Sequence, residues 1–238
     1  MAAMEVRVIS IGAMAAHPLR GERTPVRTGH ATTTLVRAGK RVILVDPGLP
    51  TPALVARLGE RAGIGPEDVT DVFLTSFHPE GRRALEAFAD ATWWVSADER
   101  ESVGVALALR LKQIASGEGV EGAGERDEDV VEFLRREVAL LQRCTPPEDG
   151  EFGERVSVFP LPGVTPGTCG LLIDADRHTT LICGDAIPTV EHLEQGRVPS
   201  PAADVEAARA SFEEAVEVAD LLIPGRDNVV VNPTKRPF

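Results

Sequence analysis

A short polar segment, residues 75–81, carries side chains that could do chemistry, and it directly follows an apolar run typical of a buried strand. Ser76, His78 and Glu80 lie two positions apart along it. Imidazole nitrogens and carboxylate oxygens are common ligands of divalent metals, so His78 and Glu80 could contribute to a metal site. A serine close to a histidine could instead act as a nucleophile with its base. The segment therefore allows two kinds of site, and the rest of the chain must distinguish them.

The elements that must position this segment follow from the spacing of apolar residues. β-Branched and apolar runs predict strands at 5–11, 31–36, 41–45, 69–74, 93–95, 156–159, 170–173, 180–183 and 221–223. Helical spacing predicts helices at 52–62, 82–88 and 206–218. Two more helices are expected within 97–148, joined by a flexible, acidic, glycine-rich loop at 116–125. Strands at both ends of the chain with helices between them predict an α/β (α+β) fold of two sheets with helices on their outer faces.

Length and charge limit the class of protein. A chain of 238 residues is long enough for one well-buried domain, so we expect a single domain, 1–238, with a helical insertion at about 97–148. The 37 acidic and 25 basic residues give a net charge of −12, which argues against nucleic acid or an anionic membrane as a partner. The absence of a long apolar run or a signal-peptide pattern, together with three separated cysteines, predicts a cytoplasmic, reduced protein.

Two further features are not interpreted as sites. Residues 117–122 match G-x-G-x-x-G, but a helical pattern precedes them and their glutamates would repel a phosphate, so a loop is expected. The remaining histidines have no metal-ligand spacing, and each is interpreted as exposed or capping: His17, His30, His178 and His192.

Five segments, in order, resemble those of the metallo-β-lactamase fold superfamily. They are Val42–Gly48, Thr75–Gly81, Pro162–Thr168, Cys183–Ala186 and Ile223–Asp227. They resemble, in turn, the family's Asp-x-Gly turn, its His-x-His-x-Asp-His loop, its Pro-Gly-His-Thr-Pro-Gly segment, its Gly-Asp turn and its terminal Pro-Gly-His. The chain is most similar to small members of the glyoxalase II type and of the metallo-β-lactamase domain-containing protein 1 type. The resemblance implies a four-layer αββα sandwich with a helical insertion.

The resemblance also implies what a complete site would contain. Complete members hold two Zn²⁺ or similar ions with about seven ligands, and metal-bound hydroxide attacks a carbonyl or phosphoryl centre. Carried over position by position, His78 and Asp185 remain, and Glu80 stands where the family has an aspartate. Asp46 matches a residue that supports the ligands.

Four ligand positions hold residues other than histidine. They are Ser76, Gly81, Val164 and Arg226. Catalytic zinc usually has three protein ligands and an open position, and neither metal position keeps three good ligands here. A dinuclear hydrolase is therefore not expected, and no cofactor is expected, although a single weakly bound zinc or iron ion stays open.

Arg226 has two interpretations. Arginine does not lose its proton and cannot ligate a metal, but it can form a bidentate pair with a carboxylate. Its guanidinium could have taken over the electrostatic role of the metal by neutralising Asp185 and Glu80, which would otherwise repel each other. Alternatively, position 226 is simply a surface arginine.

Three functions remain open from the sequence. In the first, the chain has lost dinuclear hydrolysis and binds a small molecule, or regulates, through the old cleft with the helical insertion as its lid. In the second, it is a residual ester or thioester hydrolase that uses one weak metal, or metal-free chemistry, around His78 and Asp185. In the third, it acts only through subunit association, as a homo-oligomer.

Overall fold

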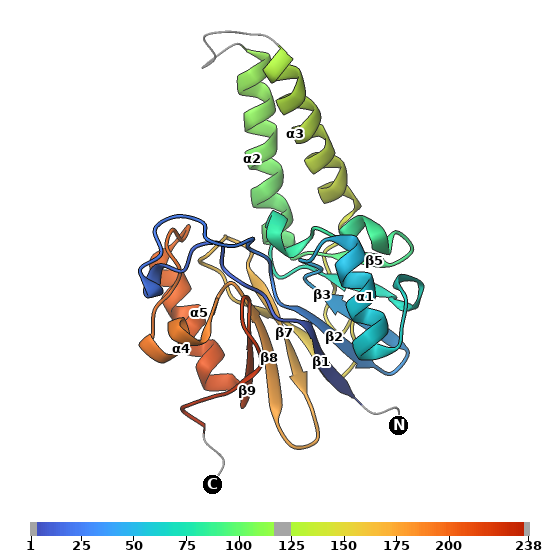
Figure 1. Cartoon of the computed structure of the whole chain (residues 1–238), viewed down its shortest axis with the longest axis vertical. Coiled ribbons are helices and arrows are strands. Elements are labelled where there is room, and N and C mark those ends of the chain that lie inside the picture. Colours follow the sequence, from blue (N-terminus) through green and yellow to red (C-terminus); the bar gives the residue numbers. More distant parts are fainter. Residues whose placement is uncertain (1–3, 117–124, 236–238) are drawn as a thin grey trace.

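The computed structural model describes residues 4–116 and 125–235, whose strands form two five-stranded sheets packed face to face (Figure 1). The first sheet has the order β1 (Glu5–Ser10), β2 (Thr33–Ala38), β3 (Arg41–Val45), β4 (Asp71–Phe73) and β5 (Thr92–Trp94). The second has the order β10 (Val230–Val231), β9 (Leu221–Pro224), β8 (Thr179–Gly184), β7 (Cys169–Asp174) and β6 (Val156–Pro160).

Parallel pairs determine where the loops meet. β3, β4 and β5 run parallel within the first sheet, and β8 and β9 run parallel within the second. The remaining pairs are antiparallel, including the β2–β3 hairpin, whose turn contains Gly39 at a φ of 63°. Because parallel strands end at the same edge of a sheet, the loops that follow β3 and β4, and those that follow β8 and β9, gather at common edges.

Helices cover the outer faces of the sandwich. α1 (Thr51–Ala62) packs on the first sheet, and α4 (Val190–Gln195) and α5 (Val205–Val218) pack on the second. The predicted α/β sandwich with helices outside two sheets is confirmed. α2 (Ala97–Ala115) and α3 (Glu125–Arg143) lie side by side and form an arm. The arm extends away from the sandwich in Figure 1, and a role for the insertion as a lid stays a prediction.

The alternation of side chains along β3 shows why the layers form. Ile43 and Val45 point between the two sheets, whereas Leu44 points toward α1, and all three are fully buried. Burying such a side chain stabilises the fold by about 1.5–3 kcal/mol. A strand buried on both faces appears in the sequence as a continuous apolar run, which is why a strand could be predicted at 41–45.

Some local predictions differ from the structure. The helix predicted at 82–88 is instead a short 3-10 turn, Leu85–Phe88, next to a second one at Pro79–Gly81. The Arg82 side chain donates to the Phe77 carbonyl at 3.0 Å and ties the segment to the loop after β4. Two other 3-10 turns, Pro18–Arg20 and Pro66–Asp68, together with α4 and β10, were not predicted. Residues 117–124 of the predicted loop, with their glycine motif, lie outside the described residues.

No helix in the described parts of the chain is both long and apolar enough to cross a bilayer. All three cysteines are free and buried, in keeping with the predicted reduced set.

Candidate functional site

Four loops converge on one small cavity at the edge of the sandwich. Asp46 follows β3, His78 follows β4, Asp185 follows β8 and Arg226 follows β9, and all four residues line this cavity. Its volume is about 10 Å³. A single water molecule occupies about 10–15 Å³ of such volume, so the enclosed part of this cavity is about the size of one water molecule.

Arg226 lies between two carboxylates. Its Nε donates to Asp185 Oδ1 at 2.8 Å and its Nη2 donates to Asp185 Oδ2 at 2.7 Å. Its Nη1 donates to the Glu80 carboxylate. The Arg226 side chain is only 7% exposed, so the interpretation as a surface arginine is wrong and the predicted carboxylate pairing is present.

Charge and burial act in opposite directions on this cluster. Burial raises the pKa of the Asp185 carboxyl, but the charge and hydrogen bonds of Arg226 outweigh burial and hold the pKa below its ordinary value. Burial also lowers the pKa of Arg226, and Asp185 and Glu80 more than reverse this effect. The guanidinium and Asp185 therefore stay ionised as a pair.

Glycines let the backbone approach both carboxylates. A Cβ at Gly225 would lie 2.7 Å from Asp185 Oδ1, and a Cβ at Gly29 would lie 2.3 Å from Glu80 Oε1. Both distances are far below van der Waals contact, so any larger residue at either position would push a carboxylate away from Arg226. The two glycines thus help to fix the geometry of the cluster.

Asp46 supports the loop after β4. Its Oδ1 accepts from the Thr75 N–H at 2.9 Å, and its Oδ2 accepts from the Thr75 hydroxyl at 2.7 Å. Its backbone has a φ of 48°, a left-handed conformation that aspartate tolerates better than most residues. Burial raises the pKa of the Asp46 carboxyl to about 7, although the Thr75 hydrogen bonds oppose the rise.

The predicted nucleophile and base are not joined in this structure. His78 is exposed, and its Nδ1 accepts from the Glu80 N–H at 3.3 Å. Ser76 is buried, and among the described hydrogen bonds none links it to His78. The structure therefore brings both residues to the cavity without forming the pair that metal-free chemistry would require.

Two of the replaced ligand positions differ in their surroundings. A Cβ at Gly81 would lie 3.5 Å from Asp46 Oδ1, an ordinary contact, so this position could accept a side chain at the cavity. Val164 is not among the residues that line the cavity, and its carbonyl accepts from the Ala203 N–H at 3.1 Å.

The donor set does not fit the two metal ions of the family that the sequence resembles. Within residues 4–116 and 125–235, no group of three or more His, Cys, Asp or Glu side chains is arranged to hold a metal ion. Both oxygens of Asp185 face a guanidinium, which cannot donate electrons to a metal. Glu80, His78 and Asp185 therefore do not form a ligand set while Arg226 stays in place.

Sequence reasoning missed Glu99, which joins the site loops to the arm. Its side chain is buried, and its two carboxylate oxygens accept from the Phe77 N–H at 2.7 Å and the Thr165 hydroxyl at 2.6 Å. The Ser96 side chain caps the start of α2 by accepting from the Glu99 N–H at 3.1 Å. The Ser-x-x-Glu pattern before the apolar run of α2 is the signal that could have revealed this helix start.

The predicted exposure of His17 and His192 is wrong, because both are buried, and His17 lies at the N-cap of the Pro18–Arg20 turn without a capping bond from its side chain. The Thr189 hydroxyl lies 3.1 Å from His17 Nε2 and 2.9 Å from His192 Nδ1. Burial lowers the pKa of His192, and the nearby His17 lowers it further. His178 is exposed, as expected. The contacts of His17 join positions more than 170 residues apart, which local sequence cannot show.

Comparisons with known proteins agree with this architecture. A family model of the metallo-beta-lactamase superfamily matches residues 26–226. No curated protein matches the chain in sequence.

Among solved structures, the chain is similar to a Thermotoga maritima protein described as a metallo-beta-lactamase, with 22% identity, a TM-score of 0.64, and coverage of 96% of this chain and 99% of that one. A hydrolase in the beta lactamase superfamily has 18% identity and a TM-score of 0.61, covering 99% of this chain and 93% of that one. A dizinc quorum-quenching lactonase, solved with a product, has 20% identity and a TM-score of 0.58, covering 79% of this chain and 67% of that one. At these identities the likeness concerns the fold.

Proposed function

Because this chain belongs to the metallo-beta-lactamase superfamily, we propose that it is a member in which a guanidinium has replaced the metal ions and dinuclear hydrolysis has given way to a binding or regulatory role. The observation that supports this proposal is the contact of Arg226 with both Asp185 and Glu80. The lactonase activity named for a structural neighbour is not carried over to this chain.

The electrostatics favour a stable replacement. Without a cation, two carboxylates in a partly buried cleft would repel each other, and one would have to protonate or move away. The guanidinium supplies a positive charge and three nitrogen donors in a fixed plane, which matches a bidentate pair with Asp185 plus a single contact to Glu80. A metal ion entering this site would have to displace Arg226 and leave a buried charge without its partners, which is strongly unfavourable.

The same contacts suggest the chemistry of a ligand. Asp185 accepts two hydrogen bonds from Arg226, whereas Glu80 accepts one. Glu80 is therefore the partner that can swing out, and a small carboxylate or phosphate ligand would take its place on Nη1. Under this proposal, binding is competition between an internal and an external anion for Arg226.

A binding experiment tests this ligand class. Isothermal titration with small carboxylates and phosphates should show binding that Glu80→Gln strengthens, because the neutral amide competes less well for the guanidinium. Arg226→Met should abolish the binding. An affinity that neither substitution changes would contradict the proposed ligand class.

Metal analysis tests the loss of the dinuclear site. Purified wild-type protein dialysed against excess zinc should retain much less than one equivalent. A fourfold variant carrying Ser76→His, Gly81→His, Val164→His and Arg226→His should retain at least one equivalent, because it restores the four imidazoles. Arg226→Lys is the matched control, since it keeps the positive charge and adds no ligand. Stoichiometric, tightly held zinc or iron in wild type would contradict the proposal.

A residual ester or thioester hydrolase is the second candidate, supported by the fact that His78 and Asp185 line one cavity with Asp46. Ester and thioester turnover that disappears in His78→Ala but survives in Arg83→Ala, an exposed neighbour, would support this candidate. Absence of turnover, or equal turnover in wild type and His78→Ala, would remove it.

A further inference from the structure

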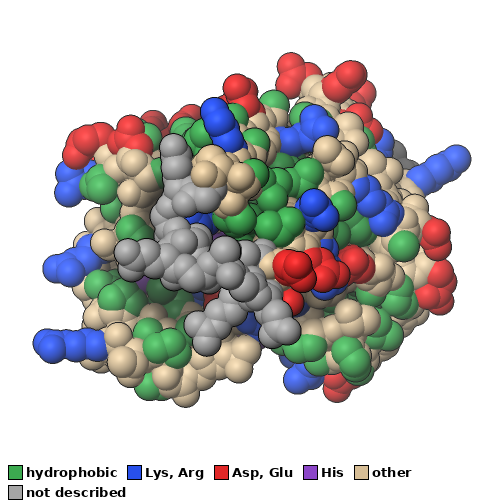
Figure 2. Space-filling model, turned by 90° about the horizontal axis from the view of Figure 1, so that it is seen from above, with side chains coloured by type: hydrophobic (Ala, Val, Ile, Leu, Met, Phe, Trp, Pro, Cys, Tyr) green, Lys and Arg blue, Asp and Glu red, His purple; other side chains and the backbone are tan. Residues whose placement is uncertain are grey.

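The α2–α3 arm leaves apolar surface without a partner in its own chain. Val105 and Leu109 of α2 are 53% and 56% exposed, and they belong to an uninterrupted apolar run, Val103–Leu109. A stretch of helix that is apolar around its whole circumference, as these two turns are, is normally buried on all sides. α3 covers only one side of α2, where Leu134 and Leu141 are buried. Figure 2 shows hydrophobic side chains gathered among charged ones on the face seen from the top of the arm.

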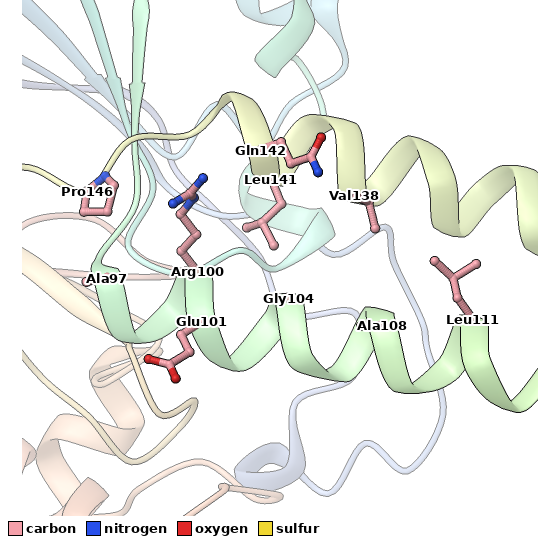
Figure 3. A pocket seen from close by; sticks show the side chains of 10 residues that line it. All are labelled: Ala97, Arg100, Glu101, Gly104, Ala108, Leu111, Val138, Leu141, Gln142 and Pro146. Atoms are coloured by element: carbon pink, nitrogen blue, oxygen red, sulfur yellow. The ribbon is translucent and has the colours of Figure 1, made fainter.

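The close-up in Figure 3 shows which sides of α2 are already used. Leu111 points toward α3, and Val138 and Leu141 point back toward α2, whereas Glu101 points away from α3. Beside this contact lies an open groove of about 590 Å³ whose floor includes Gly104 and Ala108. The side of α2 that carries Glu101 is therefore not covered by the described parts of the chain.

Four exposed residues on this side form one stripe along α2. Glu101, Val105, Ala108 and Lys112 follow each other at intervals of four, three and four residues, which places them on one face of a helix. The stripe begins with a negative charge, has two apolar residues in the middle, and ends with a positive charge. Among the described residues, neither Glu101 nor Lys112 has an ion-pair partner. We call these four residues the α2 stripe.

We propose that the α2 stripe is the contact surface for a second copy of this chain, whose α2 packs antiparallel to it about a twofold axis between residues 106 and 107. This axis sets Glu101 against Lys112 of the partner subunit and sets Val105 against Ala108 of the partner subunit. The pairing is self-complementary, as a twofold interface requires, because each contact occurs twice. A parallel arrangement would instead set like charges against each other, so the charges select the antiparallel orientation.

Shape agrees with this assignment. The valine of each copy meets the small alanine of the other, which allows the two helices to approach closely, since interaxial distance depends on side chains at the contact. Leu109 borders the stripe and would be partly covered as well. The arm itself provides the reach, because it extends well clear of the sandwich in Figure 1 and leaves α2 open to a partner. This inference is independent of the proposed function of the cavity.

Sedimentation equilibrium on the full chain tests the proposal, and wild type should show a concentration-dependent mass that approaches twice 25.4 kDa. Glu101→Lys or Lys112→Glu alone places like charges at both ends of the contact, and each should raise the dissociation constant about tenfold. The two changes together should restore the wild-type constant to within about threefold, because the charges are only exchanged. Val105→Asp should raise the constant at least about a hundredfold, since it brings a carboxylate into the centre of the interface.

Phe133→Asp is the matched control, because Phe133 is a 57% exposed apolar residue of the same arm that lies outside the stripe. It should leave the constant unchanged, and circular dichroism confirms that each variant is folded. A wild-type protein that stays monomeric at every concentration would overturn the proposal, as would a dimer that Val105→Asp does not weaken. A double charge variant no better than the single variants would overturn the antiparallel pairing.

Discussion

Replacing Arg226 by methionine removes the charge that holds two carboxylates together while keeping a long side chain. Breaking a buried ion pair by removing one partner costs about 3–5 kcal/mol, because the other charge is left uncompensated. Asp185 and Glu80 keep 23% and 24% of their side chains exposed, so water offsets part of this cost. We therefore expect Arg226→Met to lower the free energy of unfolding at pH 8 by about 2–3 kcal/mol, which is a fall of about 5–10 °C in Tm for a protein of this size.

The pH dependence has a definite sign. In wild type the pKa of Asp185 is lowered, so the stabilisation from its ion pair is present above the ordinary carboxyl pKa and is lost as the pH falls through the lowered value. In Arg226→Met, burial without the guanidinium raises the pKa of Asp185, and the variant regains stability once this carboxyl protonates. The difference in unfolding free energy between wild type and variant should therefore shrink to less than half between pH 8 and pH 4.

Urea unfolding followed by circular dichroism measures both effects. Arg57→Met is the matched control, because this arginine is 48% exposed and pairs with a glutamate on the surface of α1, and its loss should cost less than about 0.5 kcal/mol. Adding Asp185→Asn and Glu80→Gln to Arg226→Met should recover more than half of the lost stability. An Arg226→Met variant as stable as wild type at pH 8, or a penalty that does not change with pH, would refute the reasoning.

Three further predictions concern the residues around the cluster, each measured by urea unfolding. Because burial raises the pKa of Asp46 to about 7, its protonated form contributes stability that is fully present below the ordinary carboxyl pKa and is lost as the pH rises through about 7. Between pH 4 and pH 8, the free energy of unfolding of Asp46→Asn should therefore rise by up to about 4 kcal/mol relative to that of wild type. A pH-independent difference would contradict this. Gly29→Ala should lower the free energy of unfolding by about 1–3 kcal/mol by displacing Glu80. Gly59→Ala, with open space around it in α1, should raise it by about 0.5–1 kcal/mol. Equal effects would show that Glu80 does not need the close approach of Gly29. Glu99→Ala should cost about 3 kcal/mol because it leaves the Phe77 N–H without its acceptor, and exposed Asp98→Ala should cost less than about 1 kcal/mol; a mild effect at Glu99 would show that the link is dispensable.

The fold and the core of the cluster could be predicted because they depend on patterns along the chain. Apolar runs such as residues 43–45 indicate burial on both faces of a strand. The order of the five short segments indicates which strand ends meet. Arg226 could be assigned a carboxylate partner because an arginine cannot ligate a metal and the remaining carboxylates need a positive charge nearby.

Other features depend on contacts that the local sequence does not contain. His17 and His192 were interpreted as exposed or capping because each lies in a polar stretch. In the structure both are buried, and both contact the Thr189 hydroxyl. Glu99 belongs to a helix-start pattern, which predicts where α2 begins. The pattern gives no sign of the contacts that Glu99 makes with Phe77 and Thr165. The position of the arm is likewise a matter of tertiary packing, which the helical spacing of its apolar residues does not show.

The most direct test of the guanidinium replacement is a crystal structure of wild-type protein grown with excess zinc, with anomalous data collected at the zinc absorption edge. We predict planar guanidinium density from Arg226 against Asp185 and Glu80, and no anomalous peak among His78, Glu80 and Asp185. A strong anomalous peak bound to Asp185, with Arg226 displaced toward solvent, would contradict the account.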